Sequence, residues 1–229
     1  MPSPPGSGAV RAIFGGLASL RGGRALHPNG VVVRGTFRAT GPGGGAELLA
    51  PGVERAVDVR FSRGAGVPDP LPDVRGCAIR VVDAYGPGRH QDFPLASSFS
   101  RPAGRHALVP GMDFFRAFYS SVLPYRIAGE TRLVAATLDG GAGEGPGTAG
   151  IAAAARAGRL RVRLATATPR GPWEEVATLE LDAVAPPADA RALRFNPWNS
   201  GGGIRPAGWL MALRDPAYRG SQAAVPDAG

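Results

Sequence analysis

The sequence predicts a mainly β protein with a few helices, folded as a closed eight-stranded antiparallel barrel. About eight short runs alternate apolar with polar residues, as strands do when only one face is buried. The turns between these runs are rich in Gly and Pro, of which the chain has 35 and 23. A chain of 229 residues is long enough to enclose one core. Short strands separated by such turns are typical of closed antiparallel barrels.

Four strands are predicted in the first half of the chain. They cover residues 31–40, 53–63, 73–82 and 90–99. In the second of them, Arg60 and Ser62 fall on the polar side, because successive side chains of a strand point to opposite faces. We therefore expect Arg60 and Ser62 to share one face of the sheet. The single cysteine, Cys77, lies in the third strand, which excludes a disulfide within the chain and favours a buried, unreactive thiol.

The second half is predicted to contain four more strands and two helices. The strands cover residues 131–138, 159–167, 176–183 and 190–195. Met112, Phe115, Tyr119 and Val122 recur at helical spacing, which predicts a helix over 112–123 that ends before Pro124. The other helix is terminal. A marginal short helix is also expected within residues 10–20. Residues 41–52 and 139–150 are Gly-rich and predict loops, the second of them mobile.

The charge pattern argues against a nucleic-acid role. The formal net charge is +8, and every basic residue is Arg. These arginines are spread along the chain without a dense cluster or an accompanying nucleic-acid motif. No run of about 18 apolar residues predicts a membrane span. The first 20 residues lack the pattern of a secretory signal, so we expect a cytoplasmic protein.

The most informative stretch is 194–222, near the carboxyl end. Arg214 and Tyr218 are four residues apart, so on a helix they lie on one face. A nearby cation lowers the pKa of a phenol and favours the phenolate, which is one of the axial ligands of haem proteins. The stretch resembles the haem-ligand segment of the catalase family. The residues that match its turn, its loop and its ligand pair are Phe195, Asn196, Pro197, Asn199, Gly203, Ile204, Pro206, Arg214 and Tyr218.

Upstream segments extend the resemblance to residues 24–222. They match the family's Arg-x-x-His-x-x-Gly opening, its Val-Arg-Phe-Ser strand and its Asp-x-Arg-Gly hairpin entry. The matching residues are Arg24, His27, Gly30, Gly35, Phe37, Arg60, Ser62, Asp73, Arg75 and Gly76. The resemblance implies haem b, with its iron held by Tyr218 and with Arg214 as the charge partner of that ligand.

The same resemblance implies roles for the remaining site residues. His27 would be the acid–base catalyst on the distal side of the haem, and Ser62 would hydrogen-bond to it. Arg24 and Arg60 would contact the haem propionates. Phe115, or its neighbour Phe114, would cover the distal face of the haem.

The sequence departs from the family pattern at three places. Pro28 follows His27 where Ala is usual, and Val225 stands where an arginine is expected. The asparagine that orients the peroxide is replaced within Leu95-Ala-Ser-Ser, which leaves only the hydroxyls of Ser97 and Ser98. We therefore expect weak dismutation of hydrogen peroxide and peroxidase-type oxidation instead.

These observations predict a haem-dependent peroxidase- or catalase-like oxidoreductase acting on hydrogen peroxide or an organic hydroperoxide with an organic reductant. The expected parts are an arm with a short helix at 1–23, a barrel at 24–195 and a haem-ligand loop and helix at 196–229. One alternative is a hydroperoxide-rearranging or biosynthetic haem enzyme of the same fold. Another is a barrel that has lost haem and serves as a binding protein. The sequence leaves the oligomeric state open, a homo-oligomer included.

Overall fold

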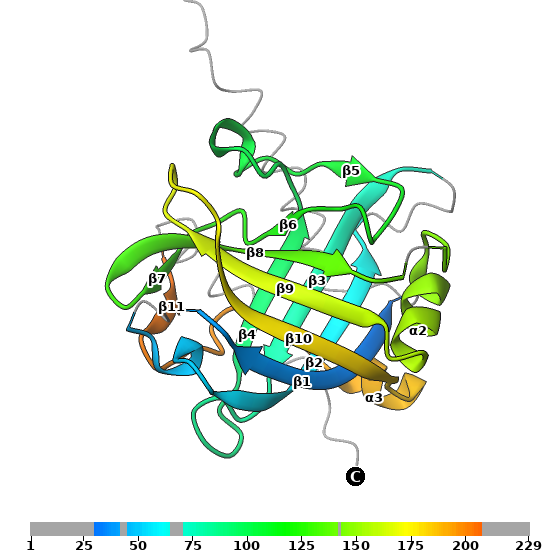
Figure 1. Ribbon diagram of the computed structural model, residues 1–229, viewed down its shortest axis with the longest axis horizontal. Helices are drawn as coiled ribbons and strands as arrows, with labels where there is room; N and C mark the ends of the chain where they lie inside the picture. Colours follow the sequence, from blue (N-terminus) through cyan, green and yellow to red (C-terminus); the bar gives the residue numbers. More distant parts are fainter. Residues whose placement is uncertain (1–29, 42–44, 65–70, 142, 208–229) are drawn as a thin grey trace, which may run out of the picture.

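The computed structural model describes residues 30–41, 45–64, 71–141 and 143–207. Its centre is a closed antiparallel barrel (Figure 1). The strands of the barrel follow the order β8-β6-β4-β3-β2-β1-β10-β9, and β9 pairs again with β8 to close it. Their bounds are β1 (Val31–Ala39), β2 (Glu54–Arg63), β3 (Asp73–Val81), β4 (Gln91–Ser97), β6 (Tyr119–Ser120), β8 (Glu130–Asp139), β9 (Leu160–Ala167) and β10 (Glu174–Val184). The prediction of an eight-stranded antiparallel barrel is thus confirmed.

The alternation of side chains places the core inside the barrel. Val59 and Phe61 of β2 and Ile79 of β3 are fully buried in one continuous apolar cluster. Burying such side chains stabilises the fold by roughly 1.5–3 kcal/mol each. Cys77 lies among them, and burial raises the pKa of its thiol far above the usual range. The expected burial of this cysteine is confirmed.

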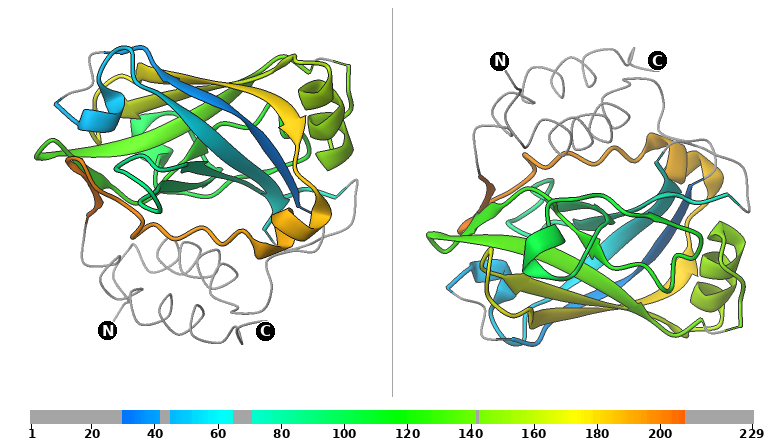
Figure 2. Two further views of the ribbon diagram at one scale, coloured as in Figure 1. Left: turned by 90° about the horizontal axis from the view of Figure 1, so that it is seen from below. Right: turned by 90° about the horizontal axis from the view of Figure 1, so that it is seen from above.

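Short elements surround the barrel. They are η1 (Glu47–Leu49), η2 (Pro102–Gly104), β5 (Pro110–Gly111), β7 (Tyr125–Ile127), α2 (Thr148–Arg156), α3 (Pro187–Ala192) and β11 (Ile204–Pro206). Helix α2 lies at one end of the barrel (Figure 1) and places Ile151, Ala154 and Ala155 in the core. The segment from α3 to β11 runs along the outside of the barrel (Figure 2). None of the helices in the described ranges is long and apolar enough to cross a membrane.

Two predicted elements are wrong. Residues 112–123 do not form a helix but turn at 114–116 and then enter β6. The spaced aromatic residues reach the core from this turn and from the strand, and the Tyr119 hydroxyl donates to the Phe114 carbonyl at 2.8 Å. Residues 190–195 are not a strand, because α3 occupies Pro187–Ala192. Pro187 in its first turn and Asp189 near its N-terminus both favour a helix.

One helix was not predicted. Residues 139–150 read as a loop, but α2 begins at Thr148 and continues to Arg156. Its alanines are the best helix formers, while the preceding glycines hide its start. The eighth barrel strand is therefore β6 and not the predicted segment 190–195.

Gly35 lies at an irregularity where the register between β1 and β10 shifts. A Cβ atom at this position would lie 1.8 Å from the Glu180 carbonyl oxygen. We expect Gly35→Ala to lower the free energy of unfolding by about 1–3 kcal/mol, because the two backbones must separate. Urea denaturation followed by circular dichroism measures this. The control is Gly111→Ala, whose Cβ would approach no described atom closer than 4.0 Å, and an equal loss in both variants would contradict the explanation.

Candidate cofactor site on the outer face of the barrel

Strands β2, β3 and β4 carry a band of small side chains on the outer face of the barrel. Directly opposed residues of an antiparallel pair point to the same face, so the register identifies this band. Ser62 opposes Gly76, which opposes Ala96, and in the next row Ala78 opposes Pro94. We call these residues, Ser62, Gly76, Ala78, Pro94 and Ala96, the outer platform. Because these side chains are short, a flat ligand can lie close against this face of the barrel.

Arg60 borders the platform, since it opposes Ala78. It is only 7% exposed although it lies on the outer face. Burial, and secondarily the positive charge of Arg194, lowers the pKa of the Arg60 guanidinium. A desolvated cation with a second cation near it favours an anion as its neighbour.

Two glycines fit closely against the predicted site residues. A Cβ atom at Gly30 would lie 2.9 Å from Arg60 Nε, and one at Gly76 would lie 2.8 Å from Ser62 Oγ. Contacts this short require the neighbouring atom to move. Glycine at 30 therefore leaves room for the Arg60 guanidinium, and glycine at 76 leaves room for the Ser62 hydroxyl. The structure confirms that Arg60 and Ser62 share the outer face.

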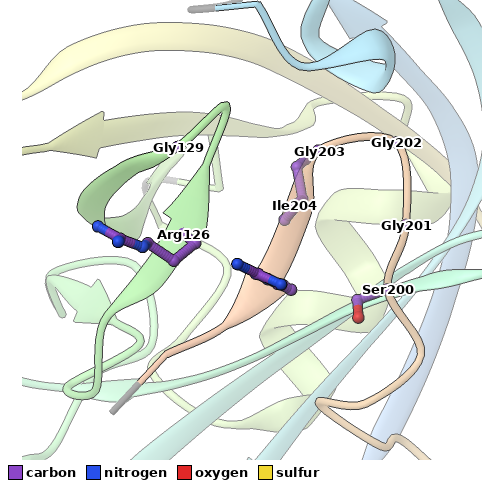
Figure 3. Close-up of a pocket in the computed structure, with 8 residues that line it drawn as sticks. Arg126, Gly129, Ser200, Gly201, Gly202, Gly203 and Ile204 are labelled. Atoms are coloured by element: carbon purple, nitrogen blue, oxygen red, sulfur yellow. The ribbon is translucent and has the colours of Figure 1, made fainter.

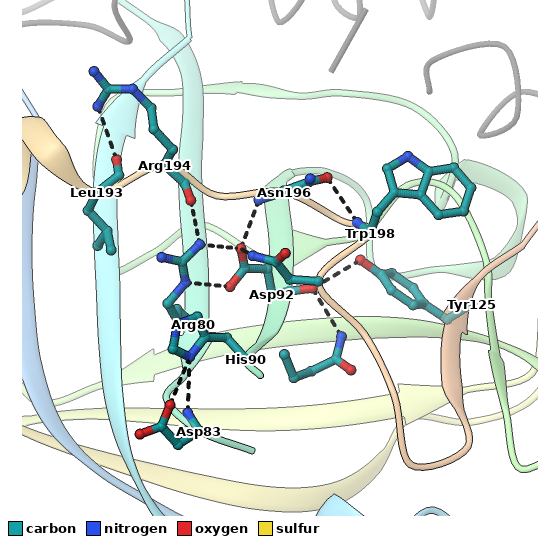
Figure 4. Close-up of polar contacts among 11 residues, drawn as sticks. Arg80, Asp83, His90, Asp92, Tyr125, Leu193, Arg194, Asn196 and Trp198 are labelled. Carbon is teal, nitrogen blue, oxygen red and sulfur yellow. Dashed lines mark hydrogen bonds and ion pairs between the residues drawn. The ribbon is translucent and has the colours of Figure 1, made fainter. Parts of the chain in front are cut away.

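A buried carboxylate on the next row holds the segment 194–199 against the barrel (Figure 4). Asp92 is fully buried and accepts from Arg80 Nε at 2.8 Å and from Arg80 Nη2 at 2.7 Å. It also accepts from the Asn196 amide at 2.8 Å and from Asn199 Nδ2 at 2.9 Å. Two asparagines of the matched turn thus meet an ion pair of the barrel wall. We call Arg80, Asp92, Asn196 and Asn199 the Asp92 latch.

Further contacts fix the shape of the turn at the latch. The Trp198 amide donates to Asn196 Oδ1 at 3.0 Å, and the Asn199 amide donates to the Asn196 carbonyl at 2.9 Å. The Arg80 guanidinium lies 5.3 Å from the centre of the Phe195 ring. The Trp198 indole N–H is buried and has no hydrogen-bond partner among the residues that the structure describes.

The latch could have been found in the sequence. The predicted turn at 83–89 is centred on Gly86, and pairing the flanking strands about that centre places Arg80 opposite Asp92. Opposite charges at opposed positions are a cross-strand stabilising pair. The asparagine contacts could not have been found, because they join residues more than 100 positions apart.

The structure places only part of the predicted site. Arg24, His27, Arg214 and Tyr218 lie outside the described residues. Phe115 is half-buried, its amide donates to Asp113 Oδ1 at 2.8 Å, and its ring leaves no room for a Cβ at Gly141. Its role at a cofactor remains a prediction.

Other aromatic and hydroxyl candidates serve the barrel itself. The Phe114 ring is fully buried and lies 6.0 Å from the Phe61 ring in the core. The Ser97 hydroxyl accepts from the Arg75 amide at 2.9 Å and donates to the Val109 carbonyl at 2.5 Å. Ser98 bonds to the Ser120 hydroxyl at 2.8 Å. Both serine hydroxyls are therefore already engaged within the protein.

Comparison with solved structures supports the fold. The chain is similar to a structure described as a bacterial catalase, with a TM-score of 0.63 and 16% sequence identity. The match covers 87% of this chain and 56% of the catalase, so the chain spans little more than half of that protein. No protein-family model matches the sequence, and no curated protein matches it either. The comparison shows a catalase-like fold.

Proposed function

We propose that this chain is a haem-dependent peroxidase- or catalase-like oxidoreductase that acts on hydrogen peroxide or an organic hydroperoxide. One observation carries the proposal, namely that matched motifs distant in sequence meet on the outer face of the barrel. Gly30 of the first motif packs on Arg60 of the second, and Gly76 of the third packs on Ser62. The antiparallel pairing of β1, β2 and β3 brings these four positions together, and the glycines leave room for the Arg60 and Ser62 side chains.

The described residues fit a haem group. Haem is flat and apolar with two propionates, and the outer platform supplies short side chains beside a buried guanidinium. Guanidinium groups bind carboxylates in bidentate geometry, and such pairs are strongest where water is excluded. Arg24 is the proposed second partner of the propionates, and Tyr218, with Arg214 beside it, is the proposed ligand of the iron.

Bound haem would supply the redox chemistry of peroxide reduction. The chain's own residues would manage the proton. His27 would accept a proton from the hydroperoxide and donate it to the departing oxygen, which is general acid–base catalysis. Ser62 would hold the imidazole of His27 in one tautomer through a hydrogen bond. Gly76 would serve this step indirectly, since a larger residue would push the Ser62 hydroxyl aside.

Peroxidase-type turnover is the proposed outcome, in preference to fast dismutation. The segment 95–98 lacks an asparagine, and the hydroxyls of Ser97 and Ser98 are engaged by Val109 and Ser120. No amide from this segment would orient a second hydrogen peroxide. A reducing organic substrate would complete the cycle in its place.

Haem titration of the purified full chain tests the proposal. We expect one haem per chain with the absorption spectrum of a tyrosinate-ligated ferric iron. We expect faster turnover of an organic hydroperoxide with a reductant than release of dioxygen from hydrogen peroxide. Absence of any Soret band would reject the haem enzyme and favour a binding barrel. Isomerisation of a lipid hydroperoxide without consumption of reductant would favour a rearranging enzyme.

Ser62→Ala tests the positioning role of Ser62. We expect kcat/KM for the peroxide to fall about tenfold, by analogy with the loss of a group that orients a metal-bound imidazole. The ionisation seen in the pH–rate profile should move as well, which a purely structural effect would not cause. Ser100→Ala is the matched control, because Ser100 is exposed and only its backbone carbonyl is used. Equal profiles in the wild type and Ser62→Ala would contradict the role.

A further inference from the structure

A cleft of about 390 Å³ lies between the hairpin of β7 and β8 and the loop that leads into β11 (Figure 3). This volume is at the lower end of the range of small-molecule sites, roughly 300–1,000 Å³. Its lining residues are Arg126, Gly129, Ser200, Gly201, Gly202, Gly203, Ile204 and Arg205. None of them belongs to the outer platform or to the Asp92 latch.

Two arginines stand side by side at this cleft. Arg126 of β7 and Arg205 of β11 are directly opposed in the antiparallel register, so both side chains project from the same face. Both side chains are exposed, and both residues line the cleft. Like charges directly opposed across two strands destabilise a sheet. The pair therefore carries an electrostatic cost that an anion between the guanidinium groups would remove.

No carboxylate within the described ranges neutralises the pair. Arg126 donates only to the Thr131 hydroxyl, at 3.2 Å, and Arg205 forms no ion pair with a described residue. The nearest acidic residue along the hairpin, Glu130, lies 3.6 Å from Arg132 Nη1, and Glu174 also pairs with Arg132. Glu130 and Glu174 are thus engaged by Arg132, and no described carboxylate forms an ion pair with Arg126 or Arg205.

The glycine loop beside the arginines is already fixed. The carbonyls of Gly201, Gly202 and Gly203 accept from the amides of Ile204, Glu47 and Ala128, at 2.7, 3.1 and 2.8 Å respectively. Gly202 has a φ of 51° and lies so close to the Tyr85 ring that a Cβ would be 2.4 Å from Cε1. These contacts hold the loop in place, so the cleft needs little ordering when a ligand binds.

We propose that this cleft binds the phosphate group of a small phosphomonoester. A phosphate monoester carries close to two negative charges, which matches two guanidinium groups better than the single charge of a carboxylate does. Planar guanidinium groups bind phosphate oxygens in bidentate geometry. The Ser200 hydroxyl, whose contact among the described residues is a long 3.4 Å hydrogen bond to the Trp198 carbonyl, supplies a further donor. The space beside the arginines accommodates the organic part of such an ester.

Titration calorimetry of the full chain with inorganic phosphate tests the site, with acetate as the singly charged probe at the same ionic strength. We expect phosphate to bind more tightly than acetate. Arg126→Gln and Arg205→Gln should each weaken phosphate binding at least tenfold. The control is Arg116→Gln, since Arg116 is exposed and sits beside Asp113 outside the cleft, and it should bind as the wild type does. Ribose 5-phosphate should bind more tightly than inorganic phosphate if the space beside the arginines is used.

Thermal melting gives a second readout that does not depend on haem. Without phosphate, Arg205→Gln should melt at a slightly higher temperature than the wild type, because one of two opposed like charges is gone. With phosphate, only the wild type and Arg116→Gln should gain stability, since a ligand stabilises the state that binds it. The proposal is overturned if acetate binds as tightly as phosphate, if Arg205→Gln retains the affinity of the wild type, or if Arg116→Gln loses it equally.

Discussion

Asp92→Ala is expected to lower the free energy of unfolding by about 3–5 kcal/mol, the usual result of removing one partner of a buried ion pair. Asp92 is fully buried, and the Arg80 side chain is only 11% exposed. The substitution leaves the guanidinium without its anion. It also leaves the Asn196 amide and the Asn199 side-chain amide without their acceptor. The turn at 194–199 should then detach from the barrel.

Urea denaturation followed by circular dichroism measures the first effect, and hydrogen exchange at the Asn196 amide measures the second. Asp92→Asn should lower the free energy of unfolding less than Asp92→Ala does, because the asparagine side chain keeps an oxygen that still accepts a hydrogen bond. The control is Asp182→Ala on the exposed side of β10, which should stay within about 0.5 kcal/mol of the wild type. If Asp92→Ala also stayed within that range, the latch would not hold the segment.

Tyr218→Phe is expected to abolish the tyrosinate-ligated haem spectrum and to weaken haem binding at least about 100-fold, more than the loss of a group that only orients a ligand. A phenyl ring has no oxygen to donate to the iron, while its size and apolar character are kept. Peroxidase turnover should be lost together with the spectrum. This outcome depends on the proposed function.

Tyr85→Phe is the matched control for that substitution. It also removes one phenolic hydroxyl, but this hydroxyl donates to Gln91 Oε1 at 2.8 Å within the protein. The variant should therefore lose some stability and keep the haem spectrum. A Tyr218→Phe protein with the spectrum of the wild type would show that another residue holds the iron.

Most strands of the barrel could be predicted from the alternation of apolar and polar residues along the chain. Strands β2, β9 and β10 alternate apolar buried residues with polar ones over most of their length, and the turns between strands contain Gly, Pro or Asp. The two errors came from segments in which local pattern and tertiary contacts disagree. In 112–123, aromatic residues at helical spacing fill the core from a turn and a two-residue strand. A strand as short as β6 gives no periodic signal of its own.

The candidate site was predictable only where one strand carries two of its residues. Arg60 and Ser62 are two positions apart, so the period of a strand alone places them on one face. The packing of Gly30 on Arg60 and of Gly76 on Ser62 depends on the register between strands, which local sequence does not specify. The pairing of Arg126 with Arg205 could not be predicted either, because β7 and β11 are far apart in the sequence.

The pairing of β1 with β10 has a consequence for the newly made chain. Val33 of β1 pairs with Val184 of β10. Strand β1 can therefore form this pairing only after almost the whole barrel has left the ribosome. Until then β1 and β9 expose unpaired edges, which are templates for association with other chains. Contacts between such distant residues also slow folding, because a long loop must close first. The need for chaperones during synthesis should therefore fall sharply once β10 has been made. The Asp92 latch should form after that.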